Sequence, residues 1–161
     1  MKTSGPFRVA RDHERTYPGS SKLATEAVIN LLRTGALVGN EIGRVLRRHG
    51  LTPATFNVLM ILEGAAGALC PSDIGDRLLV TRGTVTGLLD SLERAGLIVR
   101  EPDPEDRRML RIAMTAKARA LLRKVWVEHF PAEVRLMAGL TKREQDELVK
   151  LLGKLQDHLQ D

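Results

Sequence analysis

The chain has 161 residues, a net charge of +5 and a 43% share of hydrophobic residues, which is enough for the core of about one domain. Aromatic residues are scarce, at three Phe, one Trp and one Tyr, and this argues against binding of single strands or RNA by base stacking. No segment is long and apolar enough to cross a membrane, and the first residues lack a signal-peptide core. We therefore expect a cytoplasmic protein that does not bind membranes.

The excess of positive charge lies in the N-terminal third of the chain. Lys2, Arg8, Arg11 and Arg15 precede the first expected helix, in a stretch interrupted by prolines and a Gly-Ser-Ser run. We predict a flexible N-terminal tail over residues 1–20. The alternative is an arm whose basic side chains contact DNA phosphates.

The next segment, residues 22–48, has the apolar spacing of a long amphipathic helix. Its apolar positions recur every three or four residues and are Ala24, Val28, Leu31, Gly35, Val38, Ile42 and Val45. Such a seam is suited to packing against another helix.

Residues 69–115 contain two short amphipathic helices followed by two strands. Pro71 can occupy the first position of the first helix, whose apolar face includes Ile74, Leu78 and Leu79. Thr81 can cap the second helix and Gly96 can end it, and Val85, Leu88, Leu89 and Leu92 form its apolar stripe. The link between these helices is so short that they must cross steeply, as the helices of a helix-turn-helix do.

The opposite face of the second helix is short, polar and nearly free of bulk. Two glycines inside a helix each cost about 1 kcal/mol relative to alanine, which suggests that something approaches this backbone closely. The major groove of DNA would do so, whereas a solvated face with tolerated glycines is the alternative. The candidate DNA-binding residues of this helix are Thr81, Arg82, Gly83, Thr84, Thr86, Gly87, Asp90 and Arg94.

Two short strands, residues 97–100 and 110–114, are predicted from β-branched and alternating residues. The loop from Pro102 to Arg108 is rich in proline and aspartate, so we expect an irregular turned loop without strand structure. We interpret this loop as a wing, a loop between two strands that contacts DNA. Its candidate DNA-binding residues are Asp106, Arg107 and Arg108, because arginine suits a narrow minor groove. A bracing ion pair between Asp106 and an arginine is the alternative.

The C-terminal part is predicted to be helical. Thr115 can open a helix that Pro131 should kink or interrupt, and Thr141 and Glu144 form a capping box for the last helix. That helix carries Leu148, Leu151, Leu152, Leu155 and Leu159 on one face. The terminal apolar faces are too extensive for one small core, so they indicate a dimer; a helix bundle within a monomer is the alternative.

The segment TRGTVTGLLDSLERAGLIVREPDPEDRRMLRIAMT, with the upstream GLTPATFNVLMIL, resembles the MarR (multiple antibiotic resistance regulator) family of winged helix-turn-helix transcriptional regulators. The resemblance implies a mainly α fold with a small β-wing. It also implies a winged helix-turn-helix DNA-binding domain over residues 51–114 and a helical dimerisation region over 21–50 and 115–161. Gly87 stands where many members have an arginine, so one contact to DNA is missing.

The resemblance further implies a homodimer that binds double-stranded DNA at a pseudo-palindromic operator, as a repressor or an activator and most simply as a ligand-responsive repressor. The effector would be a small aromatic or amphipathic molecule. Candidate pocket residues are Leu37, Phe56, Met60 and Trp126, which are equally plausible as ordinary core residues.

Cys70 is the single cysteine, so a disulfide within the chain is impossible. It precedes Pro71 at a helix start, where a redox role competes with that of a small structural thiol. The scattered histidines have no metal-ligand spacing, and no catalytic motif occurs, so we expect no metal, no cofactor and no enzyme activity. A winged-helix module that binds protein, and a redox-sensing regulator acting through Cys70, remain the alternative functions.

Overall fold

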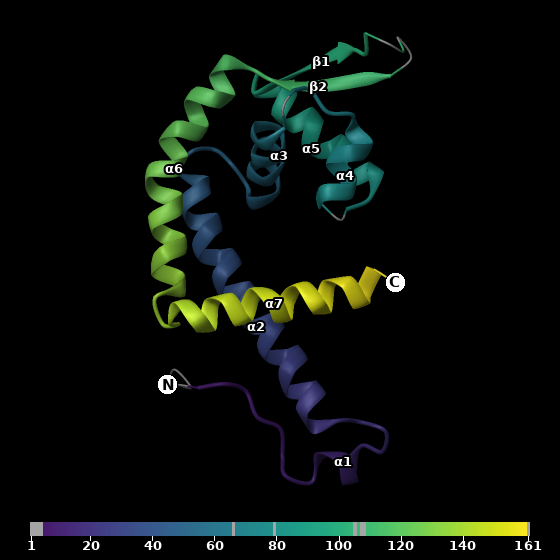
Figure 1. Cartoon of the computed structure of the whole chain (residues 1–161), viewed down its shortest axis with the longest axis vertical. Helices are drawn as coiled ribbons and strands as arrows, with labels where there is room; N and C mark the ends of the chain where they lie inside the picture. Colours follow the sequence, from purple (N-terminus) through teal and green to yellow (C-terminus); the bar gives the residue numbers. More distant parts are fainter. Residues whose placement is uncertain (1–4, 66, 79, 105, 107–108, 161) are drawn as a thin grey trace. The chain divides into compact units, whose positions relative to one another are not determined.

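Helices and one antiparallel strand pair make up the part of the chain that the structure describes, namely residues 5–65, 67–78, 80–104, 106 and 109–160. The computed structural model divides within α2 into two units, Met1–Glu41 and Ile42–Asp161. The predicted mainly α fold with a small β-wing is confirmed. In chain order the elements are α1 (His13–Thr16), α2 (Lys22–Arg47), α3 (Pro53–Gly64), α4 (Pro71–Leu78), α5 (Arg82–Arg94), β1 (Ile98–Pro102), β2 (Leu110–Met114), α6 (Ala116–Met137) and α7 (Lys142–Gln160) (Figure 1).

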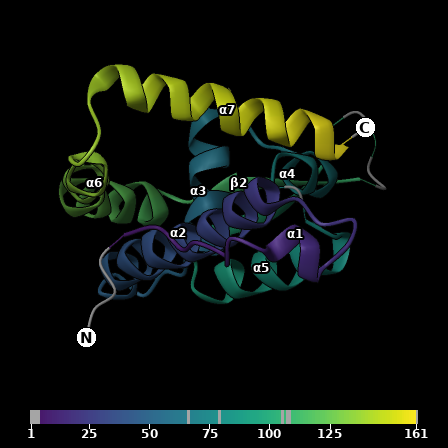
Figure 2. The same cartoon turned by 90° about the horizontal axis from the view of Figure 1, so that it is seen from below.

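In the N-terminal unit, an extended arm is bound to α2 (Figure 2). The backbone N–H of Phe7 donates to Asn30 Oδ1 at 2.7 Å, and Asn30 Nδ2 donates back to the Phe7 carbonyl at 2.9 Å. The buried carboxylate of Glu26 accepts a hydrogen bond from Arg8 Nη1 at 2.6 Å, which lowers the pKa of Glu26. The predicted flexible tail over residues 1–20 thus includes a segment with defined contacts, while its flexibility stays a prediction.

In the C-terminal unit, side-chain caps set where the helices begin and end. Thr81 Oγ1 accepts a hydrogen bond from the Thr84 N–H, as predicted for the start of α5. Gly96 ends α5 with a φ of +69°, and the Leu97 N–H returns to the Leu92 carbonyl at 2.9 Å. This is the glycine-terminated helix end predicted from the sequence.

The core of this unit lies beneath α5. Val85, Leu89 and Leu92 are each 2% exposed, and Leu88 is partly buried beside them, so the predicted apolar stripe is confirmed. Other members of the same core are Leu59, Ile74, Ile98, Ile112, Leu122 and Val125, which come from α3, α4, both strands and α6. Because α5 buries this stripe, its polar face is turned outward.

The strands β1 and β2 pair antiparallel from Ile98 with Met114 to Pro102 with Leu110. β2 has its predicted bounds, but β1 begins one residue later than predicted and includes Pro102, which we had assigned to the irregular loop. Proline is tolerated there because β1 belongs to a two-stranded sheet, in which both strands are edge strands. Leu69 adds an antiparallel bridge to Ile112 on β2.

Of the two predicted effects of Pro131, a kink or an interruption, the interruption is wrong, because α6 runs through Pro131 as one helix (Figure 1). The kink stays a prediction. Proline removes the hydrogen bond to the carbonyl of Val127, but buried side chains before and after it, Val125, His129 and Ala132, anchor the helix through its packing. Thr115 caps α6 by accepting from the Ala118 N–H, as predicted.

The capping box at the start of α7 is confirmed. The Thr141 N–H and hydroxyl donate to Glu144 Oε2 at 2.8 and 2.7 Å, and the Glu144 N–H donates to Thr141 Oγ1. These bonds lower the pKa of Glu144, because they favour its ionised form. No helix in the described residues is both long enough and apolar enough to cross a membrane.

Candidate nucleic-acid interface

The outward face of α5 is open and low in relief. Thr81, Arg82, Thr84 and Thr86 are exposed, as are both glycines of this helix. A Cβ atom built on Gly83 or Gly87 would meet no heavy atom within 4 Å outside the helix backbone. Nothing in the described structure therefore requires these glycines, and the space above them is available to a partner.

The threonine hydroxyls on this face are already oriented by hydrogen bonds. Thr84 Oγ1 lies 3.0 Å from Thr81 Oγ1, and the Thr86 hydroxyl donates to the Arg82 carbonyl at 3.1 Å. Since that bond uses the hydrogen of Thr86, its oxygen is left as an acceptor and its methyl group as an apolar contact. Both are groups that read base edges in a major groove.

Asp90 and Arg94 lie toward the C-terminal end of the same face, where the structure gives each a partner. The Asp90 carboxylate accepts from Arg100 Nη2 on β1 at 2.6 Å, and Arg94 Nε donates to the Asp90 carbonyl at 3.2 Å. Asp90 and Arg94 are predicted from the sequence to contact DNA, whereas Arg100 is not among the predicted site residues. Two features of the sequence could have indicated this pairing. Arg100 is a charged residue in a short, otherwise apolar strand segment, and Asp90 and Glu93 lie one turn apart on the preceding helix.

The base of the wing is braced by Asp103, which the sequence analysis did not single out. Asp103 Oδ2 lies 3.2 Å from Arg111 Nε in an ion pair, and Asp103 Oδ1 accepts from the Asp106 N–H at 3.2 Å. The Asp106 carbonyl accepts from the Met109 N–H at 2.8 Å. The candidate wing residues Arg107 and Arg108 lie outside the described residues, so their roles stay predictions.

A cavity of about 440 Å³ adjoins the exposed face of α5. It lies where the first turns of α4 and α5 meet the start of β2, with Arg82 and Thr86 in its wall. The remaining lining residues are Pro71, Ser72, Val85, Met109 and Leu110. The cavity therefore lies beside the N-terminal half of α5.

Three of the four predicted effector-pocket residues are neighbours in the C-terminal unit. Trp126 Nε1 on α6 lies 3.4 Å from Met60 Sδ on α3, and both pack against the core that contains Phe56. Phe56 is 4% exposed and makes an edge contact with the His129 ring at 4.4 Å. Leu37 belongs to the N-terminal unit and is 70% exposed. The effector pocket itself stays a prediction.

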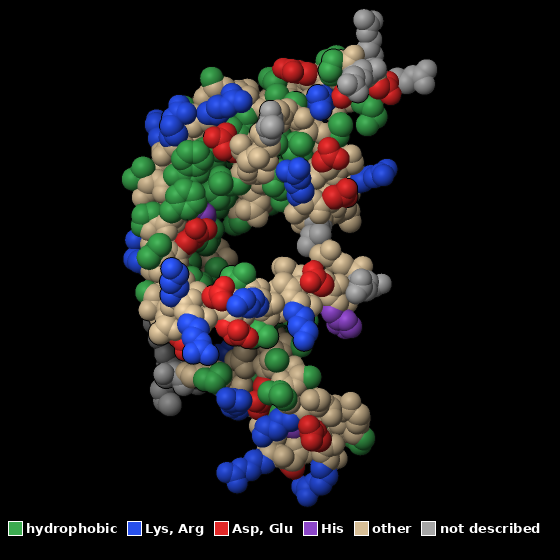
Figure 3. All heavy atoms as spheres, in the orientation of Figure 1, with side chains coloured by type: hydrophobic (Ala, Val, Ile, Leu, Met, Phe, Trp, Pro, Cys, Tyr) green, Lys and Arg blue, Asp and Glu red, His purple; other side chains and the backbone are tan. Residues whose placement is uncertain are grey.

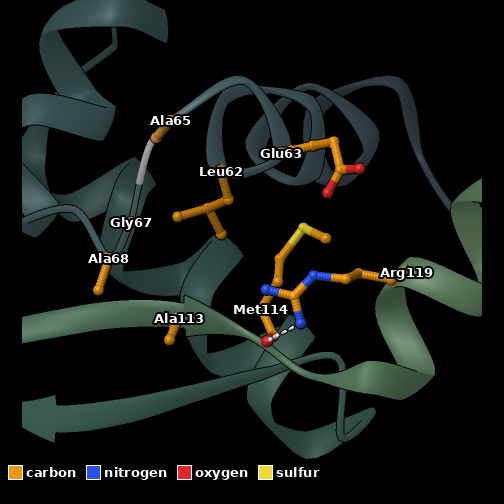
Figure 4. Close-up of a pocket in the computed structure, with 8 residues that line it drawn as sticks. All are labelled: Leu62, Glu63, Ala65, Gly67, Ala68, Ala113, Met114 and Arg119. Carbon is orange, nitrogen blue, oxygen red and sulfur yellow. Dashed lines mark hydrogen bonds between the residues drawn. The ribbon is translucent and has the colours of Figure 1, made fainter.

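A different pocket, of about 290 Å³, lies between the end of α3, β2 and the start of α6 (Figure 4). Glu63 and Arg119 face each other across Met114 at its rim, and Arg119 Nη1 donates to the Met114 carbonyl at 3.2 Å. Its other lining residues are Leu62, Ala65, Gly67, Ala68 and Ala113. None of the predicted effector-pocket residues lines it.

Cys70 is partly exposed and marks the start of α4, since its carbonyl accepts from the Ile74 N–H at 3.3 Å. This geometry fits the structural alternative, and the redox role stays a prediction. Within the ranges that the structure describes, no cluster of three or more His, Cys, Asp or Glu could hold a metal ion.

The comparisons with known proteins agree with this geometry. A sequence profile of the MarR family matches residues 49–109. The chain is 37% identical to the uncharacterised HTH-type transcriptional regulator YkoM of Bacillus subtilis over 84% of its own length and 90% of that protein. It is 30% identical to the B. subtilis transcriptional repressor YetL over 99% of its length and 96% of that protein.

A solved structure is also similar. CouR of Rhodococcus jostii RHA1, solved with p-coumaroyl-CoA bound, is 26% identical, with a TM-score of 0.75 over 84% of this chain and 95% of that one. The residues matched by the family profile contain α3, α4, α5 and β1. With relatives of this identity aligned over nearly their whole length, the chain belongs to the MarR family of DNA-binding transcriptional regulators.

Proposed function

We propose that the protein is a ligand-responsive repressor that binds a pseudo-palindromic operator as a homodimer. The first turns of α5 enter the major groove and the wing lies at the adjacent minor groove. The observation that carries this proposal is the exposed face of α5, where two glycines leave open space beside hydrogen-bonded threonines. Such a surface admits base pairs close to the helix backbone.

Thr84 and Thr86 supply hydroxyl and methyl groups toward base edges, and Arg82 supplies a guanidinium at the helix start. The N-terminal turn also carries partial positive charge, which favours a phosphate. We further propose that Arg107 and Arg108 enter the minor groove. Gly87 stands where many members of the family have an arginine. At this position, contact with DNA therefore requires a close approach of the DNA to the backbone of α5.

The homodimer is supported by apolar side chains that the described chain leaves exposed. Leu148, Leu151 and Leu155 on α7 are 36%, 57% and 40% exposed, although they form one face of an amphipathic helix. Figure 3 shows hydrophobic side chains on the surface along α6. Val127 and Phe130 of this helix are 74% and 44% exposed. A second copy would bury these stripes and present two α5 helices to successive major grooves, about 34–36 Å apart.

The repressor and effector parts of the proposal are supported by the relatives. YetL is named a repressor, and CouR was solved with p-coumaroyl-CoA, an aromatic acyl thioester. We therefore propose an aromatic or amphipathic effector bound near Phe56, Met60 and Trp126. By linkage, an effector that weakens operator binding by a given factor is itself bound more weakly by the operator complex by that factor.

The first experiment measures binding of the purified protein to the intergenic DNA upstream of its own gene, across a salt series. Wild type is compared with Thr86→Ala and Arg108→Ala, while Arg143→Ala on the exposed start of α7 is the control. We expect specific binding to a pseudo-palindrome and lower affinity for the first two variants only. Binding no better than to random duplex, with neither variant affected, would favour the protein-interaction module instead.

Two further measurements separate the parts of the proposal. Sedimentation of the DNA-free protein should give a dimer, and Leu151→Glu should shift it toward monomer; a wild-type monomer would exclude the homodimer. Trp126 is the single tryptophan of the chain, so its fluorescence reports directly on the candidate pocket. Titration with p-coumaroyl-CoA and simpler aromatic acids should quench it, and the same compounds should release DNA.

A further inference from the structure

Arg100 joins the wing to the recognition helix through two ion pairs. Its Nη2 lies 2.6 Å from Asp90 Oδ1 and its Nη1 lies 2.6 Å from Glu93 Oε2. The Arg100 side chain is 26% exposed, while the two carboxylates are 49% and 40% exposed. One guanidinium therefore spans two separate acidic groups on neighbouring turns of α5.

The positions of these two acidic residues are unfavourable without that partner. Asp90 and Glu93 lie in the C-terminal half of α5, where the partial negative charge of the helix end disfavours carboxylates. Asp90 is also on the face assigned to DNA, which is a polyanion. Two unpaired carboxylates there would repel the operator phosphates at short range.

We propose that Arg100 is a positioning residue for DNA recognition, which acts by masking the charges of Asp90 and Glu93 and by holding the end of α5 against β1. This inference rests on the proposed operator binding. In it, Asp90 contacts Arg100 and reads no base, which gives that residue a different role from the one predicted from the sequence.

The geometry requires arginine. A guanidinium offers N–H donors on two nitrogens in a planar fork, so one side chain can donate to two carboxylates at once. A lysine ammonium is a point charge and would satisfy one carboxylate well at the expense of the other. Arg100→Lys should therefore fall between wild type and Arg100→Gln in operator affinity.

The decisive test compares three purified full-length variants in operator binding at low salt. Arg100→Gln should bind about tenfold or more weakly, because it exposes two negative charges to the phosphates. The double variant Asp90→Asn/Glu93→Gln, which removes those charges and keeps Arg100, should bind at least as tightly as wild type. The triple variant, with all three substitutions, should regain most of the affinity lost in Arg100→Gln.

Each contrary outcome overturns a defined part of the inference. A triple variant as weak as Arg100→Gln would refute charge masking, because removal of both carboxylates would then not offset the loss of Arg100. A double variant with altered base preference at one operator position would show that Asp90 reads a base. An Arg100→Gln variant with unchanged affinity would refute the positioning role altogether.

Arg48→Gln is a matched control, since Arg48 donates to Glu128 on α6 at 2.9 Å and its ion pair joins other elements than that of Arg100. Its operator affinity should stay at the wild-type value.

Hydrogen exchange of the DNA-free protein tests the clamp, by which Arg100 holds the end of α5 against β1, independently of operator binding. Amides of residues 88–94 should exchange faster in Arg100→Gln than in wild type, and equal rates would contradict the clamp. Absence of operator binding by wild type would instead refute the proposed function.

Discussion

Gly87→Ala is expected to stabilise the protein and to weaken its binding to DNA. Gly87 lies in the interior of α5, and a Cβ atom at this position would meet no heavy atom within 4 Å outside the helix backbone. The alanine methyl group therefore costs nothing in packing, whereas glycine costs about 1 kcal/mol in a helix interior. Stability should rise by roughly that amount.

The same methyl group occupies the space that the proposed operator complex needs. If base edges or phosphates approach this turn of α5, a new Cβ atom holds the helix away from the groove. A loss of about tenfold in operator affinity corresponds to about 1.4 kcal/mol, which is the scale expected for one impaired contact. The two effects have opposite signs, so general damage to the fold cannot imitate them.

Two assays measure these effects separately. Thermal unfolding of the DNA-free protein should show a Tm higher by about 2–4 °C for a stabilisation of that size in a chain of this length. Fluorescence anisotropy with a labelled operator gives the affinity. Gly153→Ala is the control, because Gly153 lies within α7 and its Cβ would also meet nothing within 4 Å.

The control should gain stability and keep its operator affinity. A Gly87→Ala protein that is stabilised but binds the operator as tightly as wild type would refute the close approach of DNA to this turn. An unstable Gly87→Ala protein would instead refute the open, unstrained placement of Gly87 on α5.

Three further predictions concern the fold. Leu89→Ala should cost about 2–5 kcal/mol in urea unfolding, because a side chain that is 2% exposed is lost from the core beneath α5; a cost below 1 kcal/mol would place Leu89 outside that core. Gly96→Ala should cost about 1–2 kcal/mol, because alanine is strained at a φ of +69°, and an unchanged midpoint of unfolding would contradict that conformation. Because the folded pKa of Glu144 is lowered from 4.5, its contribution to stability is present above that value and is lost as pH falls through the folded pKa. Thr141→Val should reduce this acid dependence of Tm, and an identical profile would exclude the capping box as its cause.

The features predicted correctly from the sequence are mostly local ones. Thr81, Thr115 and Thr141 cap their helices through bonds that span three residues, and Gly96 ends α5 through its own φ. The buried stripe of α5 follows from helical spacing alone. Such signals need no knowledge of what the helix packs against, which is why they could be found in one sequence.

The features that were missed depend on residues far apart in the chain or on exposure. The pairing of Arg100 with Asp90 joins a strand to a helix, and Asn30 binds Phe7 across 23 positions of sequence. The continuation of α6 through Pro131 depends on which side chains of the helix are buried, among them Val125 and Ala132. Neither pairing partner nor exposure can be derived from local propensity.

The charge distribution bears on how such a protein would discriminate between sequences. Residues 71–119 carry nine Lys or Arg and eight Asp or Glu, and the structure pairs Arg100 and Arg111 with carboxylates of α5 and of the wing base. A nearly balanced DNA-binding surface neutralises few phosphates, and each phosphate neutralised adds about 0.9 to the steepness of the salt dependence. Nonspecific affinity is then low, and more of the binding free energy comes from close contact between α5 and the bases. An open helix face with two glycines favours such contact. The glycines lower the stability of the helix, but they allow the bases to come closer to its backbone.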